Sequence, residues 1–223
     1  MRNEPMLSDT EENYLKALFL LASARNEVTV TELSRRLGTT TPTVNSMVKR
    51  LATKQLIRYV RYRPLRLTAA GRREAAAVIR RHRLAEMYLV QKMGFGWEEV
   101  HDIAEQVEHL RSPALFDRMD VLLNHPRLDP HGSPIPDRNG KLPGHRHRKL
   151  SECRTGEEVR LAAVATSARE FLSFLNSSGL RLGTRLTIRS VEHYDGSMQV
   201  LHGRGISRTL THTVCELLLV DPA

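Results

Sequence analysis

The sequence predicts an α+β protein made of three consecutive domains. Apolar residues recur at helical spacing through much of the first half, which indicates packed helices. A stretch rich in proline and glycine follows, and the segments after it alternate apolar and polar residues as strands do. At 223 residues the chain could form one large domain or two to three smaller ones, each with its own core. We expect three, at residues 1–73, 74–142 and 143–223.

The composition favours a polyanionic partner. The formal net charge is +9 and the sequence pI is about 10.1, and Lys and Arg that neutralise phosphates are the usual source of nucleic-acid affinity. Charge alone would also suit a membrane surface, but no signal peptide and no window of ~18 uncharged apolar residues is seen. Cys153 and Cys215 lie far apart and outside any CxxC pattern, which argues against a disulfide framework or a thiolate zinc site. We expect a cytoplasmic protein.

The first expected element is an amphipathic helix that begins near Ser8. Ser8 and Glu11 have the spacing of a capping box, in which each side chain bonds the other residue's backbone N–H. Apolar residues then recur at helical spacing, at Tyr14, Leu15, Leu18, Phe19 and Ala22.

A helix-turn-helix pattern follows. A short helix is expected from Thr31 to Leu37, Gly38 ends it, and Pro42 begins the next helix after a polar turn. In the second helix, short polar groups precede cations on or near the outer face. These residues are Thr40, Pro42, Thr43, Asn45, Ser46, Lys49 and Arg50. This order is typical of a recognition helix, whose first residues meet base edges while the cations reach phosphates. An ordinary solvated helix is the alternative.

Strand-like alternation on both sides of Pro64 predicts a two-stranded wing, over residues 56–63 and 65–68. Its cations include Arg61 and Arg63. From residue 49 to residue 83 there are twelve Lys and Arg against one acid, Glu74. This excess favours DNA binding by a winged helix-turn-helix over a merely solvated basic face.

An acidic segment in this basic protein indicates a bound cation. Residues 97–110 contain five acids and two histidines but no Lys or Arg. We expect a helix here, on which Glu105, Glu108 and His109 stand at i, i+3 and i+4 and project from one side. Neighbouring carboxylates repel unless a cation lies between them, and a divalent metal ion is the simplest candidate. A plain solvated helix face would look similar.

A second pair, His82 and Glu86, stands at i, i+4 in the long helix expected after Gly71. This spacing lets both side chains coordinate one ion. Taken alone, the pair would also suit an ordinary exposed surface.

Four motifs occur in a fixed order along the chain. They are Leu-Thr-Ala-Ala-Gly at 67–71, Arg-His-Arg-Leu-Ala-Glu at 81–86, Val-His-Asp-Ile-Ala-Glu-Gln-Val-Glu-His at 100–109, and Pro-His-Gly-Ser-Pro-Ile-Pro at 130–136. As a set they closely resemble the diphtheria-toxin-repressor and manganese-transport-regulator family of iron- and manganese-dependent transcriptional regulators. The resemblance spans essentially the whole chain.

The resemblance implies a metal-activated homodimer that binds a palindromic operator in double-stranded DNA. It places the activating metal site at Asn13, Glu105, Glu108 and His109. It places an ancillary site at His82, Glu86 and His101. Glu170 is the nearest match to a further ancillary ligand that the C-terminal domain donates in some longer members. Neither a membrane nor a small organic substrate is expected as a partner.

Three positions bear on the choice of metal. Glu105 stands where the iron regulators carry a Cys, and exchanging thiolate for carboxylate favours hard ions such as Mn²⁺. Asn13 replaces an anionic or thioether ligand with a neutral amide oxygen. Lys16 stands where compact manganese regulators place a Glu ligand, which argues against their two-metal cluster. We therefore expect either Mn²⁺ or Fe²⁺.

The C-terminal domain is expected to be a small SH3-like barrel. Residues 124–149 contain five prolines, three glycines and four histidines, and are interpreted as a linker. A short helix is expected at 168–175, and Asp195-Gly196 supplies a hairpin turn. Strands are expected at 158–164, 185–191, 198–202 and 213–220. This segment resembles the SH3-like (FeoA-like) domain of the longer family members.

These observations predict a metal-dependent DNA-binding regulator, most simply a repressor of metal-uptake genes, with no catalytic residues. One alternative is a winged-helix regulator whose metal site is degenerate and which binds DNA independently of metal. Another is a metallohydrolase that uses the His and Glu cluster. The second lacks a motif such as H-E-x-x-H and leaves the basic winged helix unexplained.

Overall fold

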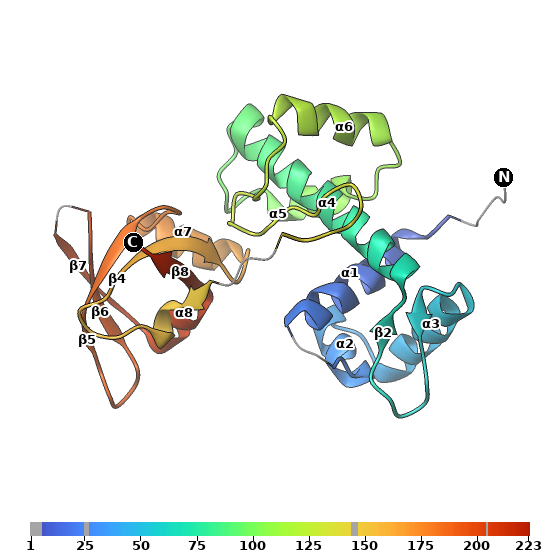
Figure 1. The fold of residues 1–223 in the computed structure, drawn as a ribbon, viewed down its shortest axis with the longest axis horizontal. Helices are drawn as coiled ribbons and strands as arrows, with labels where there is room; N and C mark the ends of the chain where they lie inside the picture. The colour runs from blue at the N-terminus through green and yellow to red at the C-terminus, as the bar shows by residue number, and fades with distance from the viewer. Residues whose placement is uncertain (1–5, 25–26, 144–146, 204) are drawn as a thin grey trace. The chain divides into compact units, whose positions relative to one another are not determined.

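The computed structural model describes residues 6–24, 27–143, 147–203 and 205–223 (Figure 1). The chain divides into two compact units. The first holds the described residues up to His82 together with Gln106–Ser112 and Pro136–Leu142. The second holds Arg83–Glu105, Pro113–Ile135 and the described residues from 143 onward. Helix and sheet are both present, as predicted.

The first unit begins with three helices, α1 (Asp9–Ala24), α2 (Val30–Leu37) and α3 (Thr41–Thr53). The predicted capping box of α1 is confirmed, because the Ser8 N–H donates to Glu11 Oε2 (2.9 Å) and the Glu11 N–H donates to Ser8 Oγ (3.3 Å). Gly38 ends α2 in a left-handed conformation with φ 60°, which glycine adopts without steric cost. Thr40 caps the start of α3 by accepting a bond from the Thr43 N–H.

The wing is an antiparallel pair, β1 (Ile57–Arg58) and β2 (Arg66–Leu67). Its strands are shorter than predicted, because the residues between them form a turn in which Tyr62 has φ 63°. Val60 and Tyr62 are exposed there. Beneath the wing, apolar side chains from α1, α2, α3 and the strands form one core with the start of α4.

Helix α4 (Ala69–Met93) begins directly after the wing and continues from the first unit into the second. Gly71 allows this close approach, since a Cβ at that position would lie 2.0 Å from the carbonyl oxygen of Leu56. The predicted long helix after the wing is therefore confirmed.

Helix α5 (His101–Val107) is shorter than the helix expected over residues 97–110. Residues 97–100 form turns instead, because Trp97 packs elsewhere: its indole N–H donates to Asn176 Oδ1 (2.9 Å) and its ring stacks on His131. Glu108 and His109 consequently follow the helix rather than lie on it. Helix α6 (Pro113–Leu122) comes next.

The linker expected over residues 124–149 is wrong for residues 128–136, which are irregular but packed, and its residues 144–146 lie outside the described residues. Asp129 and His131 are buried, and Leu128 forms a β-bridge with Pro134. Gly132 (φ 84°) lies so close to the sheet that a Cβ would be 2.3 Å from the Ala162 carbonyl oxygen. Proline and glycine here specify tight turns, which composition alone does not distinguish from a tether.

The C-terminal part is an antiparallel SH3-like sheet with strand order β3-β8-β4-β5-β6-β7, which confirms the predicted fold class. Its strands are β3 (Arg148–Lys149), β4 (Glu158–Val164), β5 (Arg185–Val191), β6 (Met198–His202), β7 (Ile206–Leu210) and β8 (Leu218–Pro222). A short 3₁₀ turn (Leu150–Glu152) and two helices, α7 (Arg169–Ser177) and α8 (His212–Leu217), complete it.

Two elements differ from the prediction for this domain. The strand expected at 213–220 is helical in its first half, because Thr211 caps α8 with its hydroxyl. Strand β7 was missed because four of its five residues are exposed, so that it lacks alternation. Among the described residues, no helix combines the length and apolar character needed to cross a membrane.

Candidate metal centres and nucleic-acid interface

The first cluster of potential metal ligands surrounds the buried carboxylate of Glu108. Lys16 Nζ donates to both of its oxygens, at 3.0 Å and 2.7 Å. His82 Nδ1 lies 2.6 Å from Glu108 Oε2. Burial raises the pKa of Glu108, but the hydrogen bond with His82 and the charge of Lys16 oppose it, and the net pKa is lowered. Glu108 is therefore held as an anion.

His109 joins the same cluster and connects it to helix α1. Its Nε2 lies 3.1 Å from the Asn13 side-chain oxygen and 3.5 Å from Glu108 Oε1, and its Nδ1 lies 2.6 Å from Glu12 Oε2. The structure thus brings together the predicted residues Asn13, Glu108 and His109. It also adds Glu12, which the sequence analysis did not select and whose ligand atom lies within 4.8 Å of those of Asp9 and His109.

The acidic first turn of α1 is the signal that could have identified Glu12. Asp9, Glu12 and Asn13 stand at i, i+3 and i+4, the spacing that had already been recognised in the acidic segment.

Glu105 lies in a different setting. Its side chain is half exposed, and its Oε1 is 3.8 Å from His101 Nε2. Within the described residues, none of the three groups of potential metal ligands includes Glu105. Its assignment to the activating site stays a prediction.

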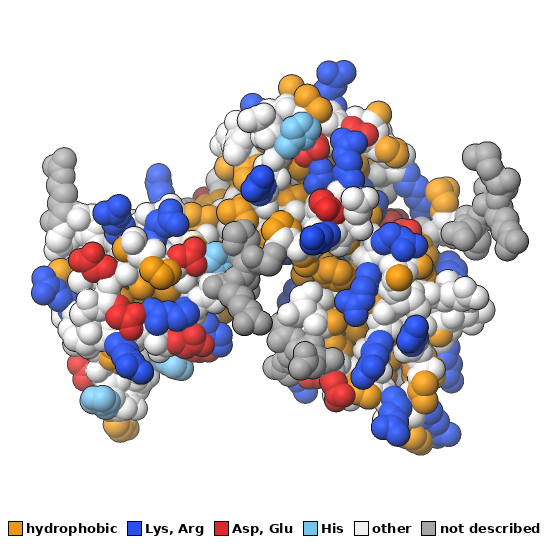
Figure 2. Space-filling view, viewed as in Figure 1, with side chains coloured by type: hydrophobic (Ala, Val, Ile, Leu, Met, Phe, Trp, Pro, Cys, Tyr) orange, Lys and Arg blue, Asp and Glu red, His pale blue; other side chains and the backbone are white. Residues whose placement is uncertain are grey.

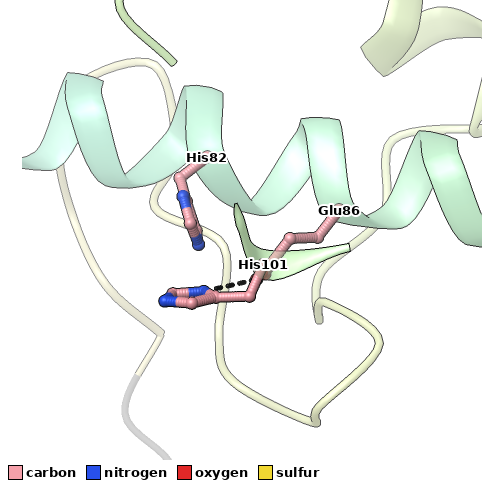
Figure 3. A group of neighbouring side chains, drawn as sticks. All are labelled: His82, Glu86 and His101. Carbon is pink, nitrogen blue, oxygen red and sulfur yellow. Dashed lines mark hydrogen bonds and ion pairs between the residues drawn. The ribbon is translucent and has the colours of Figure 1, made fainter. Parts of the chain in front are cut away.

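The second cluster is the ancillary set His82, Glu86 and His101 (Figure 3). Helix α4 is continuous through His82 and Glu86, so these side chains leave it one turn apart on the same side. The ligand atoms of the three residues lie within 4.8 Å of one another, and His101 Nδ1 is 3.3 Å from Glu86 Oε1. His82 and Glu86 are buried, so this pair is not part of an ordinary solvated surface.

A third group, Glu86, Asp129 and His131, is buried throughout and was missed by the sequence analysis. His131 Nε2 lies 2.8 Å from the Trp97 carbonyl oxygen, so that nitrogen donates and Nδ1 faces Glu86 Oε2 at 3.7 Å. Burial and the Glu86 carboxylate raise the pKa of Asp129 to about 6, against the opposing charges of Arg83 and His131.

The bond to Trp97 fixes Nε2 as the donor and turns Nδ1 toward Glu86. Burial lowers the pKa of His131, but the hydrogen bond and charge of Glu86 outweigh it and the net pKa is raised, so a metal ion at Nδ1 would have to displace a proton. The available signal was the 130–136 motif, which contains His131 and is directly preceded by Asp129.

The donor atoms in these clusters are carboxylate oxygens, imidazole nitrogens and one amide oxygen. This set fits Mn²⁺ or Fe²⁺, which accept oxygen and imidazole ligands. Cys153 and Cys215 are both buried in the core of the SH3-like domain, where burial raises the pKa of each thiol, and neither belongs to a group of potential metal ligands in the described residues. Glu170 is exposed in the first turn of α7 and belongs to none of the three groups found in the described chain.

The predicted nucleic-acid face lies on the first unit. Figure 2 shows Lys and Arg side chains gathered over it. The exposed predicted residues are Thr40, Pro42, Thr43, Ser46, Lys49, Arg50, Arg61 and Arg63, and Asn45 is half-buried. They are supported from below by Glu11, which is fully buried and pairs with Arg50 Nε (3.0 Å) and Lys54 Nζ (2.7 Å). Thr40 and Arg50 thus also have structural roles.

The tip of the wing adds a residue that the sequence analysis did not select. Tyr62 is exposed, and the Arg61 guanidinium lies 4.7 Å from the centre of its ring. Such stacking orients the guanidinium while leaving its N–H groups for phosphates.

Comparison with known proteins assigns each part of the chain. Residues 6–65 match the family model "Iron dependent repressor, N-terminal DNA binding domain". Residues 68–137 match "Iron dependent repressor, metal binding and dimerisation domain", and residues 148–222 match "FeoA domain".

Three relatives illustrate the match. The iron-dependent repressor IdeR of Mycobacterium leprae (strain TN) is 40% identical over 130 residues, 58% of this chain and 56% of that protein. The diphtheria toxin repressor of Corynebacterium efficiens is 31% identical over 193 residues, 82% of this chain and 84% of the relative. A solved structure described as a manganese-dependent transcriptional repressor in complex with manganese has a TM-score of 0.88 at 31% identity, covering 96% of this chain and 100% of that one.

The chain thus spans just over half the length of the IdeR proteins it matches, but most of the length of the diphtheria toxin repressor and all of the solved repressor structure. Together with the basic winged helix and the carboxylate and imidazole clusters, these matches place the protein: it belongs to the iron-dependent repressor family, whose members include the diphtheria toxin repressors.

Proposed function

We propose that this protein is a cytoplasmic, metal-dependent transcriptional repressor that binds operator DNA as a homodimer when Mn²⁺ or Fe²⁺ is bound, and that it represses metal-uptake genes. The observation that carries the proposal is that Asn13 on α1 and His109 after α5 share one cluster, 3.1 Å apart. That cluster lies in the same compact unit as the exposed basic face of α3 and the wing.

Asn13, Glu108 and His109 would hold the activating ion, with Glu12 close by and Glu105 as a further ligand. His82, Glu86 and His101, or Glu86 with Asp129 and His131, would hold a second ion. When bound, the ion supplies the positive charge that these crowded carboxylates need.

The regulatory consequence follows from thermodynamic linkage. Asn13 and His109 belong to segments far apart in the chain, and holding a common ligand favours one arrangement of these segments. DNA affinity rises only to the extent that this arrangement binds DNA better. A coupling of about 1–3 kcal/mol corresponds to roughly 5- to 150-fold tighter operator binding. A symmetric dimer then presents two α3 helices to half-sites about one DNA turn, or a multiple of it, apart.

The test is DNA binding by fluorescence anisotropy. Metal-stripped protein is titrated anaerobically onto promoter DNA of its own and neighbouring metal-transport genes, with Mn²⁺, Fe²⁺ or chelator. We expect one ion to tighten binding to the operator, and Glu108→Ala to abolish that gain while leaving the dimer folded. Glu158→Ala serves as the matched control, because Glu158 is exposed on strand β4 and belongs to none of the groups of potential metal ligands found in the described residues.

Two results would contradict the proposal. One is tight operator binding by the unmodified protein that neither metal nor chelator changes, which indicates a metal-independent regulator. The other is an equal metal response in Glu108→Ala and the unmodified protein.

A further inference from the structure

Lys16 donates hydrogen bonds to the carboxylate of Glu108, which lies at the centre of the first cluster of potential metal ligands. Its ammonium lies between the two oxygens of Glu108, at 3.0 Å and 2.7 Å, and 3.4 Å from His82 Nδ1. Lys16 stands three residues after Asn13 and four after Glu12, so all three side chains leave α1 on the same side. The cation is therefore placed among the ligands by the helix itself.

The burial of Glu108 gives its contact with Lys16 a clear electrostatic reason. Glu108 is fully buried, and a buried carboxylate without a cation is strongly destabilising. Lys16 is the cation that compensates it, with a side chain only 12% exposed. A metal ion bound by Asn13, His109 and Glu108 would use the same carboxylate lone pairs. The ammonium and the metal ion thus compete for one anion.

We propose that Lys16 is a tethered competitor for the metal, which sets the affinity of the activating site by holding Glu108 until an ion displaces it. The inference rests on the function proposed above. The ammonium moves away as a charged group on its flexible four-carbon stem, so no proton transfer is needed. Its remaining charge near the site also lowers the affinity of the bound ion, which makes the protein respond only at higher metal concentration.

A second lysine on the same unit provides a matched control. Lys54 Nζ lies 2.7 Å from Glu11, the other fully buried glutamate of the first unit. Both pairs join a lysine to a fully buried glutamate, and Glu11 also pairs with Arg50. Among the contacts described, Glu108 has histidine nitrogens beside it, at 2.6 Å (His82) and 3.5 Å (His109), whereas the partners of Glu11 are Lys54, Arg50 and Ser8.

The experiment measures Mn²⁺ affinity of the metal-free protein by competition with a fluorescent chelating indicator. Lys16→Met removes the charge and keeps the stem, and we expect roughly 10- to 100-fold tighter binding, since a nearby positive charge is lost from a poorly solvated site. Lys16→Arg keeps the charge and grips the carboxylate with two N–H groups, so its affinity should equal or fall below that of the unmodified protein. Lys54→Met should leave affinity unchanged.

Thermal unfolding gives a second readout. Lys16→Met should unfold at lower temperature than the unmodified protein in chelator and recover the difference when Mn²⁺ is added, whereas Lys54→Met should not recover. If Lys16→Met does not fold without metal, the Mn²⁺ affinity of Lys16→Arg relative to that of the unmodified protein tests the inference instead.

Unchanged or weaker Mn²⁺ binding by folded Lys16→Met, or tighter binding by Lys16→Arg, would overturn the inference. If Glu108→Ala still abolishes Mn²⁺ binding in that case, the proposed function stands and only the role of Lys16 fails. If Glu108→Ala binds Mn²⁺ as the unmodified protein does, the proposed metal site itself fails.

Discussion

His82 connects the chemistry of two clusters at the scale of a single residue. Its Nδ1 lies 2.6 Å from Glu108, while on α4 it stands one turn before Glu86. One imidazole therefore belongs to the predicted ancillary group and also contacts the anion of the predicted activating group. If both groups bind metal, we expect a change at either to alter the hydrogen bond that they share.

The buried carboxyl of Asp129, in the third group of potential ligands, makes the stability of the fold depend on pH. Burial and the Glu86 carboxylate raise its pKa to about 6, whereas the unfolded value is about 3.9. The folded state therefore binds the extra proton, and this contribution to stability is present in acid and is lost as pH rises from about 4 to about 6. In the presence of chelator, the free energy of unfolding should fall between acid and neutral pH by roughly 1–3 kcal/mol less in Asp129→Asn than in the unmodified protein.

Urea unfolding at pH 4.5 and pH 7 measures the effect as the difference between Asp129→Asn and the unmodified protein. Asp195→Asn is the contrasting control, because backbone and side-chain hydrogen bonds with Ser197 lower the pKa of Asp195, so its contribution is lost toward acid instead. An identical pH dependence in Asp129→Asn and the unmodified protein would show that Asp129 titrates normally.

At this scale, sequence spacing identified side chains that share a helix but not those that meet through loops. His82 and Glu86 could be paired because one helix carries both. Asp129 and His131 reach Glu86 only because a packed irregular segment returns to α4. No local periodicity reports such a return.

The elements of the first unit connect the metal cluster to the DNA-binding face. Helix α1 carries Asn13 toward His109, and Glu11 on the same helix pairs with Arg50 and Lys54 of α3 and its cap. Helix α1 is thus tied to α3 by ion pairs to one buried carboxylate. Capping residues and apolar periodicity predicted these helices well, because both signals are local.

The wing and the recognition helix should affect DNA binding differently. Arg61 is exposed on the wing, so Arg61→Ala should weaken binding to every DNA sequence and lower the slope of log K against log salt by about one. Ser46 lies on the exposed face of α3, so Ser46→Ala should mainly reduce discrimination between operator and unrelated DNA.

Anisotropy titrations over a range of salt concentrations measure both quantities. Arg189→Ala, an exposed arginine of strand β5, is the control and should change neither. An unchanged salt slope in Arg61→Ala would remove the wing from the phosphate contacts.

At the scale of the molecule, the second unit joins helices and the SH3-like sheet into one compact body. Asn176 of α7 accepts a bond from the Trp97 indole and donates to Glu98, and Gly132 packs against the backbone of β4. The sequence predicted β4, β5 and β6 of this sheet and the start of β8, but not β3, β7 or the attachment of the sheet. Long-range packing between elements depends on shapes that no single window of sequence contains.

This attachment predicts the behaviour of the chain's only tryptophan. Asn176→Ala removes the partner of the Trp97 indole and of Glu98, and we expect it to destabilise the unit by about 1–3 kcal/mol. Loosening of the sheet also lets water reach Trp97, so its emission should shift to longer wavelength. Ser177→Ala is the matched control, since the Ser177 hydroxyl bonds only within α7, to the Phe174 carbonyl oxygen, among the contacts described for it.

Because Trp97 stacks on His131, the same change should also disturb the third metal group. We expect Mn²⁺ or Fe²⁺ to quench Trp97 fluorescence in the unmodified protein and in Ser177→Ala, and to quench it less in Asn176→Ala. Equal emission, stability and quenching in all three proteins would mean that the sheet is held to the helices by other contacts and that Asn176 contributes little to them.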